Sequence, residues 1–243
     1  MKLLQDLDLV GKTVLLRLNL NVPIHDGNIM DDFRIKAVLP TIQYVKERAK
    51  KTLVAAHLGR PKGRDAAFSL KPIGEYLKKV FGDDLTVLAD CIGEDVKQAI
   101  ASAKSGSVIL LENVRFHKGE RDNDQGVGKA FSQLADIFIN DAFGDSYESY
   151  ASVVWPAKLL PSAAGLRLQK ELQALDRLKN NPQHPFLVLV GGIKIAEKMG
   201  TIRRLGAKAD HVLVGGGIAN TMLAAAGVDV KDSLIQEDEI PLA

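Results

Sequence analysis

Charged and amide side chains stand at or just beyond the ends of several apolar segments. In chain order they are Arg17, Asn19, Asn21, His57, Arg60, Lys62, Glu112, Asn113, Arg115, Asn140 and Asp141. A guanidinium group presents paired donors that match the oxygens of a phosphate or a carboxylate. If the apolar segments are parallel strands, their ends meet at one edge of a sheet, and the cations can surround one small anion. The sequence therefore predicts a site for a phosphorylated or carboxylated metabolite, although each cation taken alone would equally suit a solvated loop.

A second pattern is the segment VGGIKIAEKMG, at residues 190–200. Gly191 and Gly192 allow a backbone to approach a ligand closely, and Lys194 and Lys198 lie one helical turn apart. Two ammonium groups beside the N-terminus of a helix suit a polyphosphate. Another glycine turn, at 215–217, takes the same place after the next apolar segment. Glycine also occurs in such turns for purely steric reasons, so the spacing leaves both explanations open.

Other catalytic and metal-binding patterns are not supported. The chain contains neither the G-x-G-x-x-G fingerprint of dinucleotide sites nor a Walker sequence. Its one cysteine, Cys91, has no obvious partner, and His25, His184 and His211 stand far apart in the sequence. We therefore predict neither a nucleophile nor a metal site from these residues. The few aromatic residues are expected to pack rather than to stack on nucleic-acid bases.

The composition is that of an ordinary globular protein, with 243 residues of which 46% are hydrophobic and 26% are charged. The 32 basic and 30 acidic residues give a net charge of +2, which provides no strong field for nucleic acid or an anionic membrane. Acidic residues occur too early for a signal sequence, and no apolar segment approaches the length of a membrane span. We expect a protein of the reducing cytoplasm, with no nucleic-acid or membrane partner.

Apolar segments of strand length alternate with longer segments of helical period. The predicted strands are at residues 13–18, 52–56, 85–89, 107–111, 136–140, 186–190 and 211–214. The predicted helices are at residues 33–50, 69–81, 93–103, 127–135, 163–180, 194–207 and 217–227. Strands that are apolar throughout and that alternate with helices indicate a parallel sheet covered on both faces. The predicted fold class is therefore α/β.

The segment at 156–182 differs from the rest of the chain, because it combines prolines, a small-residue turn and one long helix. It indicates a domain boundary, with a five-stranded N-terminal domain at 1–162, a connecting helix at 163–182 and a second domain at 183–243. The second domain shows only two clear strands. Two strands and their helices make a poor core alone, so we expect this domain to be incomplete.

Eight motifs of the chain resemble those of one family in order and spacing. They are RLNLNVP, DDFRIKAVLPTI, HLGRPKG, LLENVRFHKGE, NDAFG, PSAAG, GGIKIAEK and GGGIANTM, and they are similar to motifs of phosphoglycerate kinases. The resemblance implies a Rossmann-like three-layer domain with a parallel sheet that binds phosphoglycerate, followed by an incomplete α/β domain that binds nucleotide. The implied reaction moves a phosphoryl group between 1,3-bisphosphoglycerate and ADP, and Mg²⁺ with ADP or ATP is the implied cofactor.

The resemblance also implies roles for individual residues. Arg34 would face the carboxyl group or acyl phosphate, and Lys194 would stabilise the transferred group, so these two are the implied catalytic residues. The implied phosphoglycerate-binding residues are Arg17, Asn19, Asn21, Arg34, His57, Arg60, Arg115 and Glu148. The implied nucleotide-binding residues are Gly191, Gly192, Lys194, Lys198, Gly215 and Gly216. The implied partners are 3-phosphoglycerate and an adenine nucleotide, and we expect a monomer because closure of two domains needs both faces free.

Two parts of the phosphoglycerate site depart from the family pattern. Asn19 stands where the family has an acid, and an amide still accepts a hydrogen bond, so we expect weaker binding there. After NDAFG the family has an arginine and two histidines, where this chain has Glu148, Tyr147 and Tyr150. Losing a charge-assisted bond to phosphate and adding a like charge would cost about 3–5 kcal/mol. We therefore expect Glu148 and Asn19 to suppress phosphoglycerate binding.

The family's later nucleotide-domain motifs, including the aspartate that ligates magnesium, do not occur before Ala243. We therefore assign no metal ligand and expect this chain to have weak kinase activity or none. Two function hypotheses stand: a phosphoglycerate kinase represented by a fragment or an altered chain, and a non-catalytic, degenerate family member that binds another ligand or partner through the segment 145–150. A dehydrogenase is disfavoured because the glycine spacing is wrong for a dinucleotide site.

Overall fold

The computed structural model describes residues 2–243 and divides into two compact units, Met1–Leu172 and Gln173–Ala243. The division falls inside helix α6 (Leu166–Asn180), whose first turns bury Leu168 and Gln169 in unit 1, while residues 173–180 are exposed. Among the described residues, no helix has the length and apolar character needed to cross a bilayer.

Unit 1 is built on a six-stranded sheet with the order β5-β6-β4-β1-β7-β8, in which neighbouring strands are all parallel. The strands are β1 (Thr13–Leu18), β4 (Lys51–Ala55), β5 (Leu85–Val87), β6 (Ser107–Leu110), β7 (Ile137–Asp141) and β8 (Ser162–Ala164). A short antiparallel hairpin is formed by β2 (Ile24–His25) and β3 (Asn28–Ile29). The helices that precede α6 are α1 (Phe33–Lys46), α2 (Lys71–Phe81), α3 (Glu94–Ser102), α4 (Gln125–Ser132) and α5 (Ala151–Leu159).

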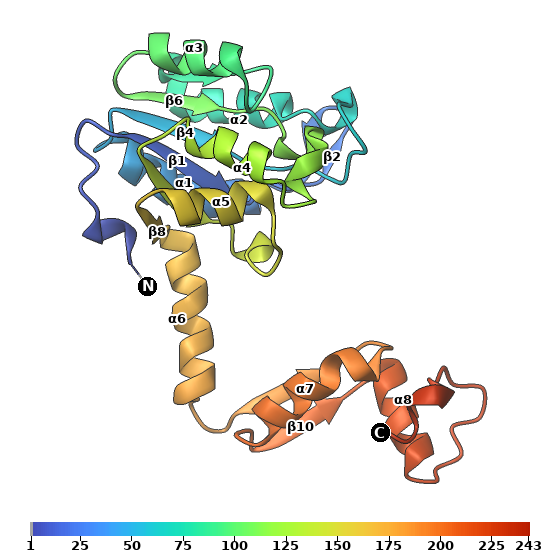
Figure 1. Cartoon of the computed structure of the whole chain (residues 1–243). Coiled ribbons are helices and arrows are strands. Elements are labelled where there is room, and N and C mark those ends of the chain that lie inside the picture. Colours follow the sequence, from blue (N-terminus) through green and yellow to red (C-terminus); the bar gives the residue numbers. More distant parts are fainter. Residues whose placement is uncertain (1) are drawn as a thin grey trace. The chain divides into compact units, whose positions relative to one another are not determined.

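Helices cover both faces of this sheet, so unit 1 has three layers (Figure 1). Alternate side chains of β1 point to opposite faces. Val14 and Leu16 join α1 and α2 in one hydrophobic core, and Leu15 joins α3 and α4 in a second core on the other face. The predicted α/β fold with a three-layer parallel sheet is confirmed. Arg17 lies two residues after Leu15 in β1, so its side chain points to the same face, the one covered by α3 and α4.

The sequence predicted five strands here, and the structure has six, because β8 was missed together with helix α5. β8 is a three-residue strand of small residues that pairs with β7, too short to give a periodic signal. Helix α5 contains Pro156, which cannot donate a backbone hydrogen bond and which indicated a boundary rather than a helix. The helix forms nonetheless because it packs along α4, where the ring of Trp155 lies directly against Gly128.

Unit 2 contains two parallel strands, β9 (Leu187–Val190) and β10 (His211–Val214), with helices α7 (Ile195–Gly206) and α8 (Gly216–Ala225). Its core is formed by Val188, Val190, Ile195 and Ile218. The leucines on the other face of this small sheet, Leu187, Leu189 and Leu213, are 55%, 79% and 53% exposed. The core of unit 2 therefore covers one face of its sheet.

Candidate functional site

The polar strand ends of unit 1 meet, as the sequence predicted. In the sheet register Arg17 of β1 lies beside Ala55 of β4 and Asn140 of β7. His57 follows β4 by two residues, and β6 pairs with β4 on its other side. Because all four strands run in the same direction, their following loops gather at one edge, where helix N-termini and loop side chains can reach a common ligand.

Arg17 is fully buried at this edge and every one of its guanidinium nitrogens has a partner. Its Nη2 lies 3.1 Å from Asp145 Oδ2 and 3.9 Å from Glu120 Oε1. Its Nε donates to Ser152 Oγ at 2.9 Å, and its Nη1 donates to the carbonyl of Leu18 at 2.6 Å. We call Arg17, His57, Glu120 and Asp145 the inner cluster. Its arginine is held by protein carboxylates rather than left open to a ligand.

His57 belongs to the inner cluster through its Nδ1, which lies 3.1 Å from Asp145 Oδ2. Burial lowers the pKa of His57; Asp145 opposes that shift and Arg17 adds to it, so the ring is neutral at pH 7. Burial raises the pKa of Asp145, but His57 and Arg17 outweigh burial and hold that pKa below its usual value. Asp145 is therefore ionised and paired, although no well-aligned hydrogen bond reaches its Oδ2.

Glu120 closes the inner cluster from the loop after β6. It is fully buried and accepts two hydrogen bonds from Ser152, one from Oγ at 2.6 Å and one from the backbone N–H at 2.8 Å. Burial raises the pKa of Glu120, and the charge of Arg17 opposes the shift. Two carboxyl groups thus face one guanidinium group and one neutral imidazole, which leaves the inner cluster without excess positive charge.

The acid that the segment 145–150 contributes to these basic residues is Asp145, whereas the prediction had named Glu148. Glu148 is exposed, and no ion pair of residues 2–243 includes it. The 3-10 turn Phe143–Asp145 that follows β7 carries the side chain of Asp145 inward, whereas Tyr147 is 81% exposed. The sequence named this segment as the place where the cationic edge is replaced, and within it the structure carries Asp145 inward and leaves Glu148 exposed.

Arg115 lies beside the inner cluster and is 8% exposed. Its Nη1 donates to the carbonyl of Gly59 at 2.7 Å, and its Nη2 donates to Tyr150 Oη at 3.1 Å, with the guanidinium carbon 5.0 Å from the centre of that ring. Tyr150 thus occupies a position where the resemblance implied a histidine. Arg60 is exposed, and its side chain makes no ion pair within residues 2–243, so the structure does not bring it into the inner cluster.

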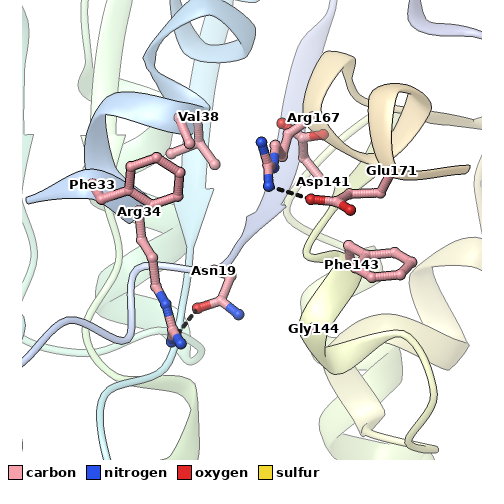
Figure 2. Close-up of a pocket in the computed structure, with 10 residues that line it drawn as sticks. Asn19, Phe33, Arg34, Val38, Asp141, Phe143, Gly144, Arg167 and Glu171 are labelled. Atoms are coloured by element: carbon pink, nitrogen blue, oxygen red, sulfur yellow. Dashed lines mark hydrogen bonds and ion pairs between the residues drawn. The ribbon is translucent and has the colours of Figure 1, made fainter. Parts of the chain in front are cut away.

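A separate cavity of about 390 Å³ opens at the same sheet edge, and we call it the Arg34 pocket (Figure 2). Arg34 and Asn19 line it from one side, and Arg167 and Glu171 of α6 line it from the other. The Nη1 of Arg34 donates to the carbonyl of Asn21 at 2.7 Å and approaches Asn19 Oδ1 at 3.5 Å. Arg167 and Glu171 form an ion pair one helical turn apart. This pocket offers an exposed guanidinium group and an amide to a small anion.

Two other predicted polar residues hold the frame of this edge. Asn21 Oδ1 accepts the backbone N–H of Gly59 at 2.9 Å, which joins the loops after β1 and β4. Asp141, which also lines the Arg34 pocket, is 1% exposed and accepts Thr41 Oγ1 at 2.6 Å and the backbone N–H of Leu168 at 2.7 Å. Burial raises the pKa of Asp141, and these hydrogen bonds oppose the shift. The hydrogen bonds of Asn21 and Asp141 hold the loops of the site in place, so the bonded oxygens of these two side chains are not free for a ligand.

The glycine turns of unit 2 follow its two parallel strands at the same edge, since Val190 and Val214 pair in the register. The turns touch, because a Cβ added at Gly216 would lie 3.1 Å from the carbonyl oxygen of Gly192. Gly191, Gly192, Lys194 and Lys198 are exposed, and Gly215 is half-buried. Lys194 caps α7 and pairs with Glu197 at 3.1 Å. The predicted glycine residues of unit 2 thus lie in two adjacent turns at one end of its strands.

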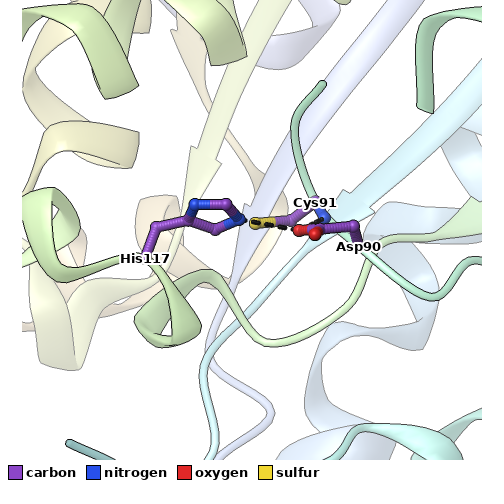
Figure 3. Close-up of side chains that lie close together, drawn as sticks. All are labelled: Asp90, Cys91 and His117. Carbon is purple, nitrogen blue, oxygen red and sulfur yellow. Dashed lines mark hydrogen bonds and ion pairs between the residues drawn. The ribbon is translucent and has the colours of Figure 1, made fainter. Parts of the chain in front are cut away.

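One side-chain grouping in unit 1 could offer three ligand atoms to an ion: Asp90, Cys91 and His117, whose ligand atoms lie within 4.8 Å of one another (Figure 3). His117 Nε2 lies 2.7 Å from Asp90 Oδ1, and Arg64 Nη2 lies 2.6 Å from Asp90 Oδ2. Burial, reinforced by nearby carboxylates, raises the pKa of the Cys91 thiol well above its usual value. A protonated thiol beside an occupied carboxylate is an internal polar contact, and we assign no metal to it.

Comparison with known proteins decides the family. A family model described as "Phosphoglycerate kinase" matches residues 4–243. The chain belongs to the phosphoglycerate kinase family. It is 46% identical over 242 residues to a phosphoglycerate kinase of Pseudothermotoga lettingae and 43% identical over 243 residues to one of Pelotomaculum thermopropionicum.

A solved phosphoglycerate kinase structure, from Coxiella burnetii, is similar to this fold with a TM-score of 0.85 and 36% identity. It covers 98% of this chain, and the chain covers 60% of it. The two curated relatives are matched over 99% and 100% of this chain but over only 61% and 62% of their own lengths. The chain therefore spans about three-fifths of the length of these phosphoglycerate kinases.

The structure brings some predicted residues together and leaves others apart. Arg17, His57 and Arg115 converge, Arg34 and Asn19 share a second pocket, and Asn21 links the loops between them. Sequence reasoning missed Glu120, Ser152 and Arg167, which complete these two sites. Glu120 and Ser152 gave no signal, because they lie 32 residues apart and meet only through packing. Arg167 was passed over as part of a boundary helix.

Proposed function

We propose that this chain carries the phosphoglycerate-binding part of a phosphoglycerate kinase, which transfers a phosphoryl group between 1,3-bisphosphoglycerate and ADP. Membership of the family supports the reaction class. The observation that supports the binding site most directly is the Arg34 pocket, where an exposed guanidinium group and the amide of Asn19 line a cavity large enough for a small acid. Relatives named as phosphoglycerate kinases favour this function over that of a non-catalytic family member.

The roles in unit 1 follow from what each side chain leaves free. Arg34 has donors that face the pocket, and we propose that it binds the carboxyl group or acyl phosphate and stabilises negative charge on the transferred group. Asn19 and Asn21 would orient the glycerate. Arg115 would contact the 3-phosphate, and the exposed Arg60 would add to the field that attracts it, whereas Arg17 and His57 would border this position without adding net positive charge.

In unit 2 we propose that the glycine turns bind nucleotide phosphates. Gly191, Gly192 and Gly216 are exposed, so a phosphate can approach their backbone closely, and Lys198 adds a charge one helical turn from Lys194. Gly215 donates its own N–H to the carbonyl of Val190 and would only shape the turn. Lys194 would stabilise the transferred phosphoryl group once its pairing with Glu197 is given up. Mg²⁺ would enter with the ADP or ATP phosphates, since the one ion-sized grouping among residues 2–243 offers sulfur and nitrogen donors that suit magnesium poorly.

The inner cluster limits this function. A phosphate that approaches Arg17 and His57 meets the ionised carboxylate of Asp145 at the position where it would need donors. We therefore propose that Asp145, rather than Glu148, lowers the affinity for the 3-phosphate. Cytoplasmic location and a monomeric state stay predictions of the sequence.

The experiment that tests the proposed function is calorimetric titration of 3-phosphoglycerate into the full chain and into Arg34→Gln. Loss of a charge-assisted bond to the ligand should weaken binding at least about tenfold. The matched control is Arg48→Gln, which removes an exposed arginine that pairs with Glu47 outside the pocket, and it should change the affinity less than about twofold. Equal losses in both variants, or no binding to the parent chain, would overturn the proposal.

A further inference from the structure

A cavity of about 460 Å³ beside Arg115 concentrates positive charge, and Arg115 is the one cation among its lining residues that the proposed function uses. Lys62, Arg115, Lys118 and Arg121 line it, and Asp122 is the single acid among its lining residues. We call this the outer cavity. His117 also lines it but is engaged by Asp90 at 2.7 Å. The outer cavity thus collects four formal positive charges against one negative charge.

Three of these cations are free, in contrast to those of the inner cluster. Within residues 2–243, the side chains of Lys62, Lys118 and Arg121 make no ion pair and no hydrogen bond, and all three are exposed. Two separate loops supply them. Lys62 follows β4, and Lys118 and Arg121 lie at the 3-10 turn Lys118–Glu120 after β6. Like charges from two loops face one hollow with Asp122 as the single acid among its lining residues, and this excess of positive charge costs free energy unless an anion binds there.

Arg115 gives this cavity a rigid wall. It is more than nine-tenths buried and is fixed by its bonds to Gly59 and Tyr150. Its Nε is buried without a hydrogen-bond partner, so part of its donor capacity is unmet by the protein. A buried cation with an unmet donor is stabilised by an anion close by, even where the anion does not touch that nitrogen.

We propose that the outer cavity is a binding site for a small molecule that carries two phosphoryl groups or a pyrophosphate. A single dianionic phosphate would leave charge unmatched, whereas a pyrophosphate group carries enough negative charge for the three free cations and Arg115. The volume falls within the range of small-molecule sites. The inner cluster cannot serve the same ligand, because Asp145 and Glu120 already match Arg17. Lys62, Lys118 and Arg121 take no part in the proposed function, which uses only Arg115 of these four cations, so the site goes beyond that function.

Inorganic pyrophosphate is the probe for the test, titrated by calorimetry into the full chain at low ionic strength. The test variant is Lys118→Gln with Arg121→Gln, both at exposed positions, and we expect it to bind pyrophosphate at least about tenfold more weakly. The matched control is Lys50→Gln with Lys129→Gln, which makes the same change in net charge with exposed lysines outside the cavity. This control should bind within about twofold of the parent chain.

Asp122→Asn sharpens the test because it should act in the opposite direction. Removing the one acid that lines the cavity should tighten pyrophosphate binding by about twofold to fivefold. Arg34→Gln should leave pyrophosphate binding unchanged while it weakens phosphoglycerate binding, so the two proposals can fail separately. The outer-cavity proposal is overturned if the parent chain does not bind pyrophosphate, if both double variants lose affinity equally, or if neither does. Far-UV circular dichroism confirms that each variant is folded.

Discussion

The inner cluster and the Arg34 pocket both contain a residue at or just beyond the end of β1, Arg17 in the first and Asn19 in the second, and they differ in whether their arginine is free to bind an anion. Arg17 of β1 is buried, and its guanidinium group is paired with the carboxylates of Asp145 and Glu120, whereas Arg34 is exposed and contacts only a carbonyl and an amide. The two regions have similar residue types and lie at one sheet edge. Their difference shows that the number of cations at strand ends overstates the charge available to a ligand when acids from other loops fold in beside them.

The largest contrast should appear in stability. Arg17→Met would leave Asp145 and Glu120 buried without their cation, so the free energy of unfolding should fall by about 3–5 kcal/mol. Arg34→Met removes an exposed guanidinium group and should cost less than about 1 kcal/mol. Urea denaturation followed by circular dichroism measures both. If the two variants lose similar stability, the inner cluster is not the closed ionic unit that its geometry indicates.

The pH dependence of stability should come from the inner cluster and not from the Arg34 pocket. The pKa of His57 in the folded chain lies below its unfolded value near 6.5. Just below that pH, His57 is therefore protonated in more of the unfolded chains than of the folded chains. The stability associated with His57 is therefore complete above about pH 6.5 and is lost as the pH falls through that value toward the folded pKa. Glu120 acts with the opposite sign at lower pH, because burial raises its pKa.

Denaturation between pH 7.5 and pH 5.5 tests this dependence. The unfolding free energy of the parent chain should fall between these two pH values, and in His57→Gln this fall should be smaller by on the order of 1 kcal/mol. His25→Gln alters an exposed histidine of the β2–β3 hairpin and should leave the decline as it is. An equal pH dependence in all three chains would show that His57 does not titrate with folding.

The smallest expected effect concerns Asn19 in the Arg34 pocket. Asn19→Asp would place a carboxylate near Arg34, which the amide now approaches at 3.5 Å, and would restore the acid that the family has there. Under the proposed role of Asn19, a charged acceptor would hold the substrate hydroxyl more strongly than an amide, and phosphoglycerate affinity should rise by about twofold to fivefold. Calorimetric titration measures the change, and a weaker affinity would mean that repulsion of the ligand dominates at this position.

Much of the fold could be predicted from the sequence because buried parallel strands leave continuous apolar segments. The strands near Leu15, Leu53, Ile109 and Ile139 all lie in or beside predicted segments. β8 could not be found, since a three-residue strand of Ser-Ala-Ala has no period and forms only by pairing with β7. The same limit applies to α5, whose packing along α4 outweighs the signal from Pro156.

The position of the candidate site could be predicted from the sequence, but the acids that pair with its cations could not. Strand direction fixed where Arg17, His57 and Arg115 would meet. Which acid joins them depends on the direction of each side chain in a tight turn, and Asp145 turns inward only three residues before the exposed Glu148. Glu120 reaches the same place from a different loop, and no local pattern marks such a contact.

Asp145 occupies the cationic end of the site, and we expect it to lower the affinity for phosphoglycerate. Calorimetric titration of 3-phosphoglycerate compares the parent chain with Asp145→Asn and Glu148→Gln, two variants that each remove one negative charge and lie three residues apart. We expect Asp145→Asn to tighten binding about tenfold or more and Glu148→Gln to change it less than about threefold. Unchanged affinity in Asp145→Asn, or a larger gain in Glu148→Gln, would show that Asp145 does not limit binding of the phosphate.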